Sequence, residues 1–309
     1  MRALNRVAAY VAAEHDRLGL ERFGIPRRPC CVLLTPRFRR SHHVIALVLD
    51  ERHAAPALVG KLPRHSRDVA GLAQEADGLR AVGPVLADDS VPALLAFEDE
   101  PGRPLLLESA LAGSPLSPAA MRHDRRRSSV KAVVAWVERL GLQTAQMPDD
   151  DAWFERLVRA PLRSLAGPQP ALRGLVELTL ERSEGLLAAG LPLVFEHGDL
   201  RHPNLLIRED GRVGVVDWER AQPAGLPAAD LFFFLAYAAD AGRQGVLEPF
   251  FGRRPWAWEL AQGYAERLGI DAGQLRPLLA LSCARAVASG ADLRRHVPLW
   301  RRALGDSWA

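Results

Sequence analysis

The chain has 309 residues, of which 48% are hydrophobic, and this length is enough for two lobes of ordinary domain size. It has no uninterrupted apolar run of about 18 residues, and charges interrupt its first residues, so we expect a cytoplasmic protein with no membrane partner. The net charge is +3 and the pI is near 9.0, but the arginines are scattered and often alternate with acids. This pattern predicts no nucleic-acid partner.

The first third of the chain predicts a small antiparallel sheet with helices. Apolar residues at helical spacing predict an amphipathic helix within residues 1–20. Five runs of strand-forming residues follow, and a helix from Asp68 through Glu75 to about Val82 separates the third from the fourth. The predicted strands are Cys30–Thr35, His43–Leu49, Pro56–Leu62, Val91–Phe97 and Pro104–Glu108.

From Ser114 onward the pattern becomes helical. The clearest amphipathic segment is Ser129–Thr144, with apolar residues repeated at helical intervals. Further helices are predicted at Asp151–Ala160, Leu172–Ala189, Ala229–Ala241, Trp256–Leu268, Gln274–Gly290 and Ala291–Leu304.

The stretch from Phe195 to Glu219 interrupts the helices and carries most of the chemistry. Its first part spaces His197, Asp199 and Asn204 as H-x-D-x-x-x-x-N. Its second part predicts a β-hairpin, with strands 205–208 and 212–216 joined by an Asp-Gly turn, the dipeptide favoured where φ is positive. Such a hairpin would bring Asn204 and Asp217 to the same end.

These residue types suit phosphoryl transfer. Mg²⁺ neutralises the charge of a transferred phosphoryl group and prefers hard oxygen ligands, which the Asn204 amide and the Asp217 carboxylate offer. A second carboxylate, Asp199, can orient and deprotonate an attacking hydroxyl. The stretch therefore predicts a metal site at Asn204 and Asp217 beside a base at Asp199.

The segments HGDLRHPN and VVDWE resemble the pattern HGDLHPGN…IDWE of the aminoglycoside phosphotransferase and choline kinase-like family. His202-Pro203 departs from the usual Pro-Gly of that pattern. The resemblance implies an α+β, protein-kinase-like fold of two lobes. An N-lobe of residues 1–109 would bind ATP or GTP, and a mainly helical C-lobe of residues 110–309 would carry the catalytic loop and the acceptor site.

The resemblance also implies roles in nucleotide binding. Lys61 would contact the α- and β-phosphates and form an ion pair with Glu75. The backbone near Glu108 and Ala110 would face the edge of the purine. The segment from Thr35 to His42 lacks the glycines of a phosphate loop, and Ser41, Arg39 or Arg40 would supply donors instead.

Within the catalytic loop, the resemblance places Arg201 where its guanidinium can reach the transferring phosphoryl group. His197 is the alternative base, although the kinase comparison favours a framework role in which it bonds backbone. Asp230 would brace the loop through backbone amides, and a helix cap would also explain it. Glu219 is a further candidate for a carboxylate near the metal.

The acceptor is expected to be a small hydroxyl compound that is neutral or anionic, such as a sugar. Residues 218–309 contain 11 arginines against 9 acids, a balance that disfavours a polycation. A pseudokinase that binds nucleotide or a protein partner without phosphoryl transfer is the alternative function. We expect a monomer or a homodimer.

Overall fold

The computed structural model describes residues 2–34, 43–52, 55–65, 68–100, 104–124, 127–167, 169–242 and 245–305. The chain folds into two compact units, one of residues 1–113 with 214–221 and one of residues 114–213 with 222–309. The predicted boundary after residue 109 lies close to the end of the first of these segments. No prediction assigned 214–221 to the first unit, where the Val215 N–H donates to the Ser90 carbonyl at 2.8 Å.

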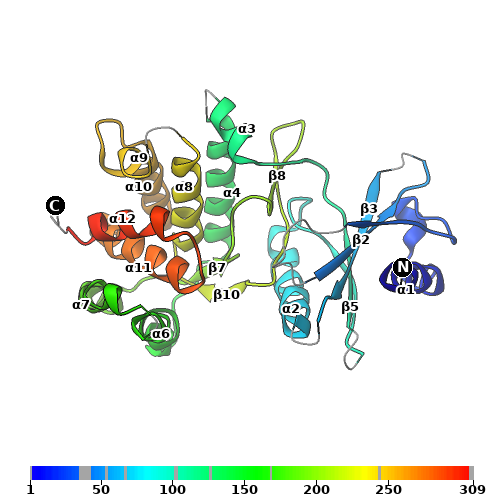
Figure 1. Ribbon diagram of the computed structural model, residues 1–309, viewed down its shortest axis with the longest axis horizontal. Coiled ribbons are helices and arrows are strands. Elements are labelled where there is room, and N and C mark those ends of the chain that lie inside the picture. Colours follow the sequence, from blue (N-terminus) through cyan, green and yellow to red (C-terminus); the bar gives the residue numbers. More distant parts are fainter. Residues whose placement is uncertain are drawn as a thin grey trace. The chain divides into compact units, whose positions relative to one another are not determined.

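The first unit is built on a five-stranded antiparallel sheet (Figure 1), as the sequence predicts. Its strand order is β1-β2-β3-β5-β4, so β4 and β1 are the edges. The pairing places Lys61 opposite Ile45 on one side and Leu106 on the other. The strands are β1 (Cys30–Leu34), β2 (His43–Leu49), β3 (Pro56–Pro63), β4 (Leu94–Glu98) and β5 (Leu105–Ser109).

Helices cover both faces of this sheet. Helix α1 (Arg2–Ala13) buries Val7 and Val11 in a cluster that includes Leu105 and Leu107 of β5. Helix α2 (Val69–Leu86) packs against Leu106, which points the other way because successive side chains of a strand alternate. Lys61 is paired with Leu106 and therefore lies on the α2 face. A 3₁₀ turn, η1 (Leu20–Phe23), follows α1.

The second unit is mainly helical, as predicted. Its helices are α3 (Pro118–His123), α4 (Ser128–Thr144), α5 (Ala152–Phe154), α6 (Ala160–Ala166), α7 (Arg173–Ala188), α8 (Ala229–Asp240), α9 (Glu248–Phe251), α10 (Trp256–Leu268), α11 (Leu275–Ala288) and α12 (Leu293–Ala303). A π-helical turn (Glu155–Arg159) joins α5 to α6, and short 3₁₀ turns occupy Pro170–Leu172 and Ala272–Gln274. The apolar helix α8 is almost wholly buried and packs against α11 and α12 (Figure 1).

Short strands carry the catalytic stretch of this unit. Strand β7 (Val194–Glu196) pairs with β10 (Gln222–Gly225), and β6 (Ser114–Pro115) pairs with β8 (Leu205–Ile207). The predicted hairpin is present: the Arg208 N–H donates to the Arg212 carbonyl at 2.9 Å, and the chain returns along β9 (Val213–Val215). Gly211 has a φ of 82°, as the Asp-Gly turn requires.

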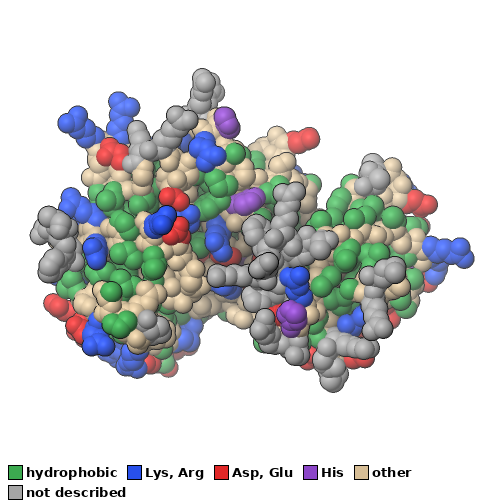
Figure 2. Space-filling view, viewed as in Figure 1, with side chains coloured by type: hydrophobic (Ala, Val, Ile, Leu, Met, Phe, Trp, Pro, Cys, Tyr) green, Lys and Arg blue, Asp and Glu red, His purple; other side chains and the backbone are tan. Residues whose placement is uncertain are grey.

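On the face shown in Figure 2, Lys and Arg side chains of the helical unit are spread among Asp and Glu. Among the described helices, none is both long and apolar enough to cross a lipid bilayer.

Candidate functional site

His197 is part of the framework of the catalytic loop, as predicted. Its side chain is fully buried, and its Nδ1 accepts the backbone N–H of Asp199 at 3.2 Å. Because Nδ1 is the acceptor, the ring proton lies on Nε2. The ring therefore fixes the backbone of the residue that carries the candidate base.

Asp230 braces the same loop from the first turn of α8, which confirms the predicted contact. Its two carboxylate oxygens accept the backbone N–H groups of His197 at 2.6 Å and Gly198 at 2.9 Å. Gly198 has a φ of 83°, a left-handed conformation that glycine adopts without a steric penalty. The residue that caps α8 is Ala228, so the alternative reading of Asp230 as the helix cap is wrong.

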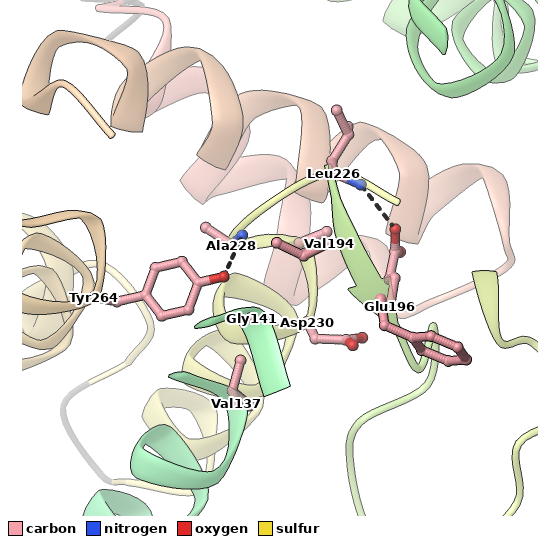
Figure 3. A pocket seen from close by; sticks show the side chains of 10 residues that line it. Val137, Gly141, Val194, Glu196, Leu226, Ala228, Asp230 and Tyr264 are labelled. Atoms are coloured by element: carbon pink, nitrogen blue, oxygen red, sulfur yellow. Dashed lines mark hydrogen bonds between the residues drawn. The ribbon is translucent and has the colours of Figure 1, made fainter. Parts of the chain in front are cut away.

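A buried polar network surrounds this brace (Figure 3). The carboxylate of Glu196 accepts a hydrogen bond from Arg285 at 3.0 Å and one from the Leu226 N–H at 3.3 Å. The Tyr264 hydroxyl accepts the Ala228 N–H at 3.3 Å. Burial and the nearby Glu196 raise the pKa of Asp230 to about 7, although its two backbone donors oppose the shift. The small cavity between these groups has room for about one water molecule and not for a substrate.

The carboxylate of Asp199 is held at both oxygens. Arg201 donates from Nε to Oδ1 at 2.7 Å, and the Asn204 amide nitrogen donates to Oδ2 at 3.2 Å and to the Asp199 carbonyl at 3.0 Å. With its nitrogen engaged in this way, Asn204 has its amide oxygen left as the group that could ligate a metal. The structure thus brings together three of the predicted site residues.

Arg201 continues into a stack of side chains that the sequence analysis missed. Its guanidinium lies 6.0 Å from the centre of the Phe233 ring, and the His296 ring stacks on Phe233 with a centroid distance of 5.7 Å and an interplanar angle of 11°. Burial and the neighbouring Arg295 lower the pKa of His296 to about 4, so this imidazole is neutral near pH 7. Only the helical spacing of aromatic residues in α8 hinted at this stack.

Arg295 lies on the same side of α8. It donates to Asp240 at 2.8 Å, and its guanidinium lies 5.1 Å from the centre of the Tyr237 ring. Tyr237 has a pKa raised by burial, which the adjacent arginines oppose. These mostly buried side chains lie on α8 and α12 close enough to Arg201 for its charge to act on Tyr237.

In the first unit, Lys61 and Glu75 form the predicted ion pair. The Lys61 ammonium lies 2.5 Å from Oε1 of Glu75, which is fully buried on α2. The same oxygen accepts the backbone N–H of Trp218 at 3.1 Å. Segment 214–221 is therefore tied to the helix that holds the lysine.

The Glu108 side chain makes a contact that the sequence analysis did not include, while the predicted role of the backbone near Glu108 and Ala110 at the purine stays a prediction. The Glu108 side chain is buried and lies 2.9 Å from the Lys61 ammonium. The N–H of Ala110 donates to the Ala57 carbonyl at 2.8 Å, so this donor is already engaged. A purine could take the Ala110 N–H only by displacing that carbonyl.

The charges around Lys61 shift two pKa values. Burial alone would lower the pKa of Lys61, but the carboxylates of Glu108, Glu75 and Asp217 outweigh it and raise that pKa above its ordinary value. Burial raises the pKa of Glu108 to about 7, although the lysine opposes the shift. Lys61 therefore remains a cation at any physiological pH.

Asp217 belongs to the first unit and Asn204 to the second, so their joint binding of a metal stays a prediction. Asp217 has a φ of 71°, a left-handed backbone that aspartate tolerates better than most residues. Glu219 lies 3.8 Å from the His43 ring nitrogen. Ser41, like Arg39 and Arg40, lies outside the described residues.

The donor set suits Mg²⁺ better than a softer metal. Within the described part of the chain, no three His, Cys, Asp or Glu side chains gather in a way that would enclose a metal. Mg²⁺ needs no such cage, because it is usually bound through one or two carboxylates together with waters and substrate phosphates. Asp217 carries a carboxylate and Asn204 a free amide oxygen, which are ligand types of this kind.

The fold is that of the protein-kinase-like phosphotransferases. A choline kinase from Streptococcus pneumoniae matches with a TM-score of 0.56 at 11% identity, over 95% of this chain and 98% of that chain. A putative fructosamine-3-kinase from Haemophilus somnus matches with a TM-score of 0.52 at 17% identity, over 95% and 96%. The GDP complex of an aminoglycoside 2'-phosphotransferase matches with a TM-score of 0.54 at 14% identity, over 95% of both chains.

The sequence profile described as the phosphotransferase enzyme family matches residues 40–278. The chain therefore belongs to this family and is a phosphotransferase. A search among curated proteins finds no matching sequence.

Proposed function

We propose that the protein is a small-molecule kinase that transfers the γ-phosphoryl group of ATP or GTP to a hydroxyl of a neutral or anionic metabolite, such as a sugar. Asp199 is the base, and Lys61, held by Glu75, contacts the α- and β-phosphates. The observation that carries the proposal is the Asp199 carboxylate, oriented at both oxygens by Arg201 and Asn204. A GDP complex of a protein with the same fold supports a nucleotide as co-substrate.

The loop residues supply the acid-base chemistry. The proton of the acceptor hydroxyl passes to Asp199, and the hydroxyl oxygen bonds to the γ-phosphorus. The bond from that phosphorus to the bridging oxygen breaks, and its electron pair leaves on the nucleoside diphosphate. Arg201 donates its Nε–H to Asp199. Its other guanidinium N–H groups are then available to the phosphoryl oxygens.

Asn204 and Asp217 would hold Mg²⁺ through their side-chain oxygens. When bound, the ion neutralises charge on the nucleotide phosphates. Glu75 keeps Lys61 in place for the same phosphates, since a buried ammonium is stabilised by the carboxylate 2.5 Å away.

The charges near Asp199 support a neutral or anionic acceptor. Arg201 is paired with the base, and Arg295 on α12 is paired with Asp240 at the end of α8. Each guanidinium group there is paired with a carboxylate, so these residues offer no surplus of negative charge that would attract a polycation. A neutral polyhydroxyl compound can instead bond to both members of an ion pair.

The test is a screen of hydroxyl acceptors with γ-labelled ATP and GTP, followed by kinetics of Asp199→Asn. Turnover should fall by about 10²–10⁴-fold while nucleotide affinity stays nearly unchanged, because a positioned base acts mainly in the transition state. Asp77→Asn, an exposed change on α2, is the control. Comparable turnover in Asp199→Asn would eliminate this residue as the base, and nucleotide binding without transfer to any acceptor would favour the pseudokinase alternative.

A further inference from the structure

We propose that Glu108 is a positioning residue that limits nucleotide affinity, because its carboxylate competes with the nucleotide phosphates for the ammonium of Lys61. The inference rests on the proposed function, which requires Lys61 to contact those phosphates. It assigns to the Glu108 side chain a role that neither the resemblance nor the family membership supplies.

Most of the N–H donors of the Lys61 ammonium already face carboxylates. An ammonium has three N–H donors. Two of them face Oε1 of Glu75 at 2.5 Å and Oε1 of Glu108 at 2.9 Å. The three side chains are 7%, 0% and 2% exposed, so water offers little competition for these contacts. About one donor remains for a phosphate oxygen.

The two carboxylates are not equivalent. Glu75 is anchored a second time, since its Oε1 also accepts the Trp218 N–H. Glu108 is held through Lys61 and has no such second donor. Among the described residues the Oε2 atoms of both glutamates lack a hydrogen-bond partner, so the Trp218 N–H is what distinguishes them. Glu75 is therefore fixed in place and holds the lysine. Glu108, which lacks the second contact, can give up its contact with Lys61 when a phosphate binds.

The strand register fixes where Glu108 acts. Lys61 on β3 is paired with Leu106 on β5, and Glu108 follows two residues later on the same face of the sheet. Replacing the carboxylate by an amide therefore leaves the side chain beside Lys61. The change removes a charge without moving the group.

The charge balance opposes phosphate binding. One ammonium faces the carboxylates of Glu75 and Glu108, and Asp217 also acts on it. These carboxylates offset the charge of the ammonium and so weaken its attraction for an anionic phosphate, and such charge interactions are strong in a buried environment. Removing the charge of Glu108 should strengthen the attraction of Lys61 for phosphate.

The experiment compares the Kd of Mg-ATP, or of Mg-GTP if that is the nucleotide bound, for the full chain and its variants by titration calorimetry. At a pH above the pKa of Glu108, which is about 7, that side chain is charged, and there Glu108→Gln should bind about tenfold more tightly than the wild type. Glu75→Gln, the matched change on the other carboxylate, should bind more weakly because the lysine loses its tether. A purely structural role of Glu108 predicts weaker binding in both variants.

The lysine must mediate the effect. In a Lys61→Met background, adding Glu108→Gln should leave the remaining affinity unchanged. A gain that persists there, or no gain in the single variant, overturns the inference. If thermal melting shows that Glu108→Gln is unfolded, Glu108→Met makes the same comparison without a buried amide. A wild type that binds neither nucleotide overturns the proposed function and the inference with it, whereas binding without a gain overturns the inference alone.

Discussion

The backbone N–H of His197 donates to the carboxylate of Asp230 at 2.6 Å, across 33 positions of the sequence. The amino end of the loop that carries Asp199 is therefore held by α8. Asp230→Asn should lower kcat by about 10–100-fold with little change in nucleotide affinity, because an amide nitrogen replaces one acceptor and the base shifts from its position. Steady-state kinetics beside Glu259→Gln, an exposed control on α10, would measure this, and an unaltered kcat would contradict a role of the brace in positioning.

Asp217→Asn should remove the magnesium dependence of nucleotide binding. Asparagine suits the left-handed backbone at this position, with its φ of 71°, and removes only the charge. Nucleotide titrations at several Mg²⁺ concentrations, with a chelator as the reference, would show the loss. Unchanged magnesium dependence in this variant would refute Asp217 as a metal ligand.

Gly78 allows α2 to pack closely against segment 214–221. A Cβ at this position would lie 2.8 Å from the Cβ of Ala221 and 3.2 Å from the Trp218 carbonyl. Gly78→Ala should therefore destabilise the protein by about 1–3 kcal/mol through overpacking. Gly185→Ala, in a helix where a Cβ meets nothing within 4 Å, should instead stabilise by about 0.5–1 kcal/mol. Equal effects of the two changes in urea unfolding would exclude close packing as the reason for the glycine.

His296 should make stability depend on pH. Its pKa falls from 6.5 to about 4 on folding, so the unfolded chain binds more protons than the folded chain between these values. The associated stability is present above pH 6.5 and is lost as the pH falls toward 4. Between pH 6.5 and pH 4, the free energy of unfolding of the wild type should fall by about 2–3 kcal/mol more than that of His296→Gln. Urea unfolding at the upper and lower pH tests this, with the exposed His123→Gln as control. If the stability of the wild type and of His296→Gln changed equally with pH, a neutral buried imidazole would be contradicted.

The sequence determined the features that depend on residues close together in the chain. The spacing of His197, Asp199 and Asn204 and the Asp-Gly turn of the hairpin are local, and their geometry follows from a few backbone dihedrals. The pairing of Lys61 with Glu75 followed from the family resemblance, which assigns this contact to a lysine on the third strand and a glutamate on the next helix. The resemblance of two short motifs then sufficed for the family.

The tertiary structure decided the contacts between distant segments. Trp218 meets Glu75 across 143 positions, and the stack of Phe233 on His296 joins α8 to α12. Glu108 turned toward Lys61 because the register of β3 with β5 puts both on one face, and a sequence does not state that register. Spacing along the chain predicts which residues share an element, whereas packing alone selects which elements meet. The catalytic loop could therefore be predicted from the sequence, whereas the contact of Glu108 with Lys61 could not.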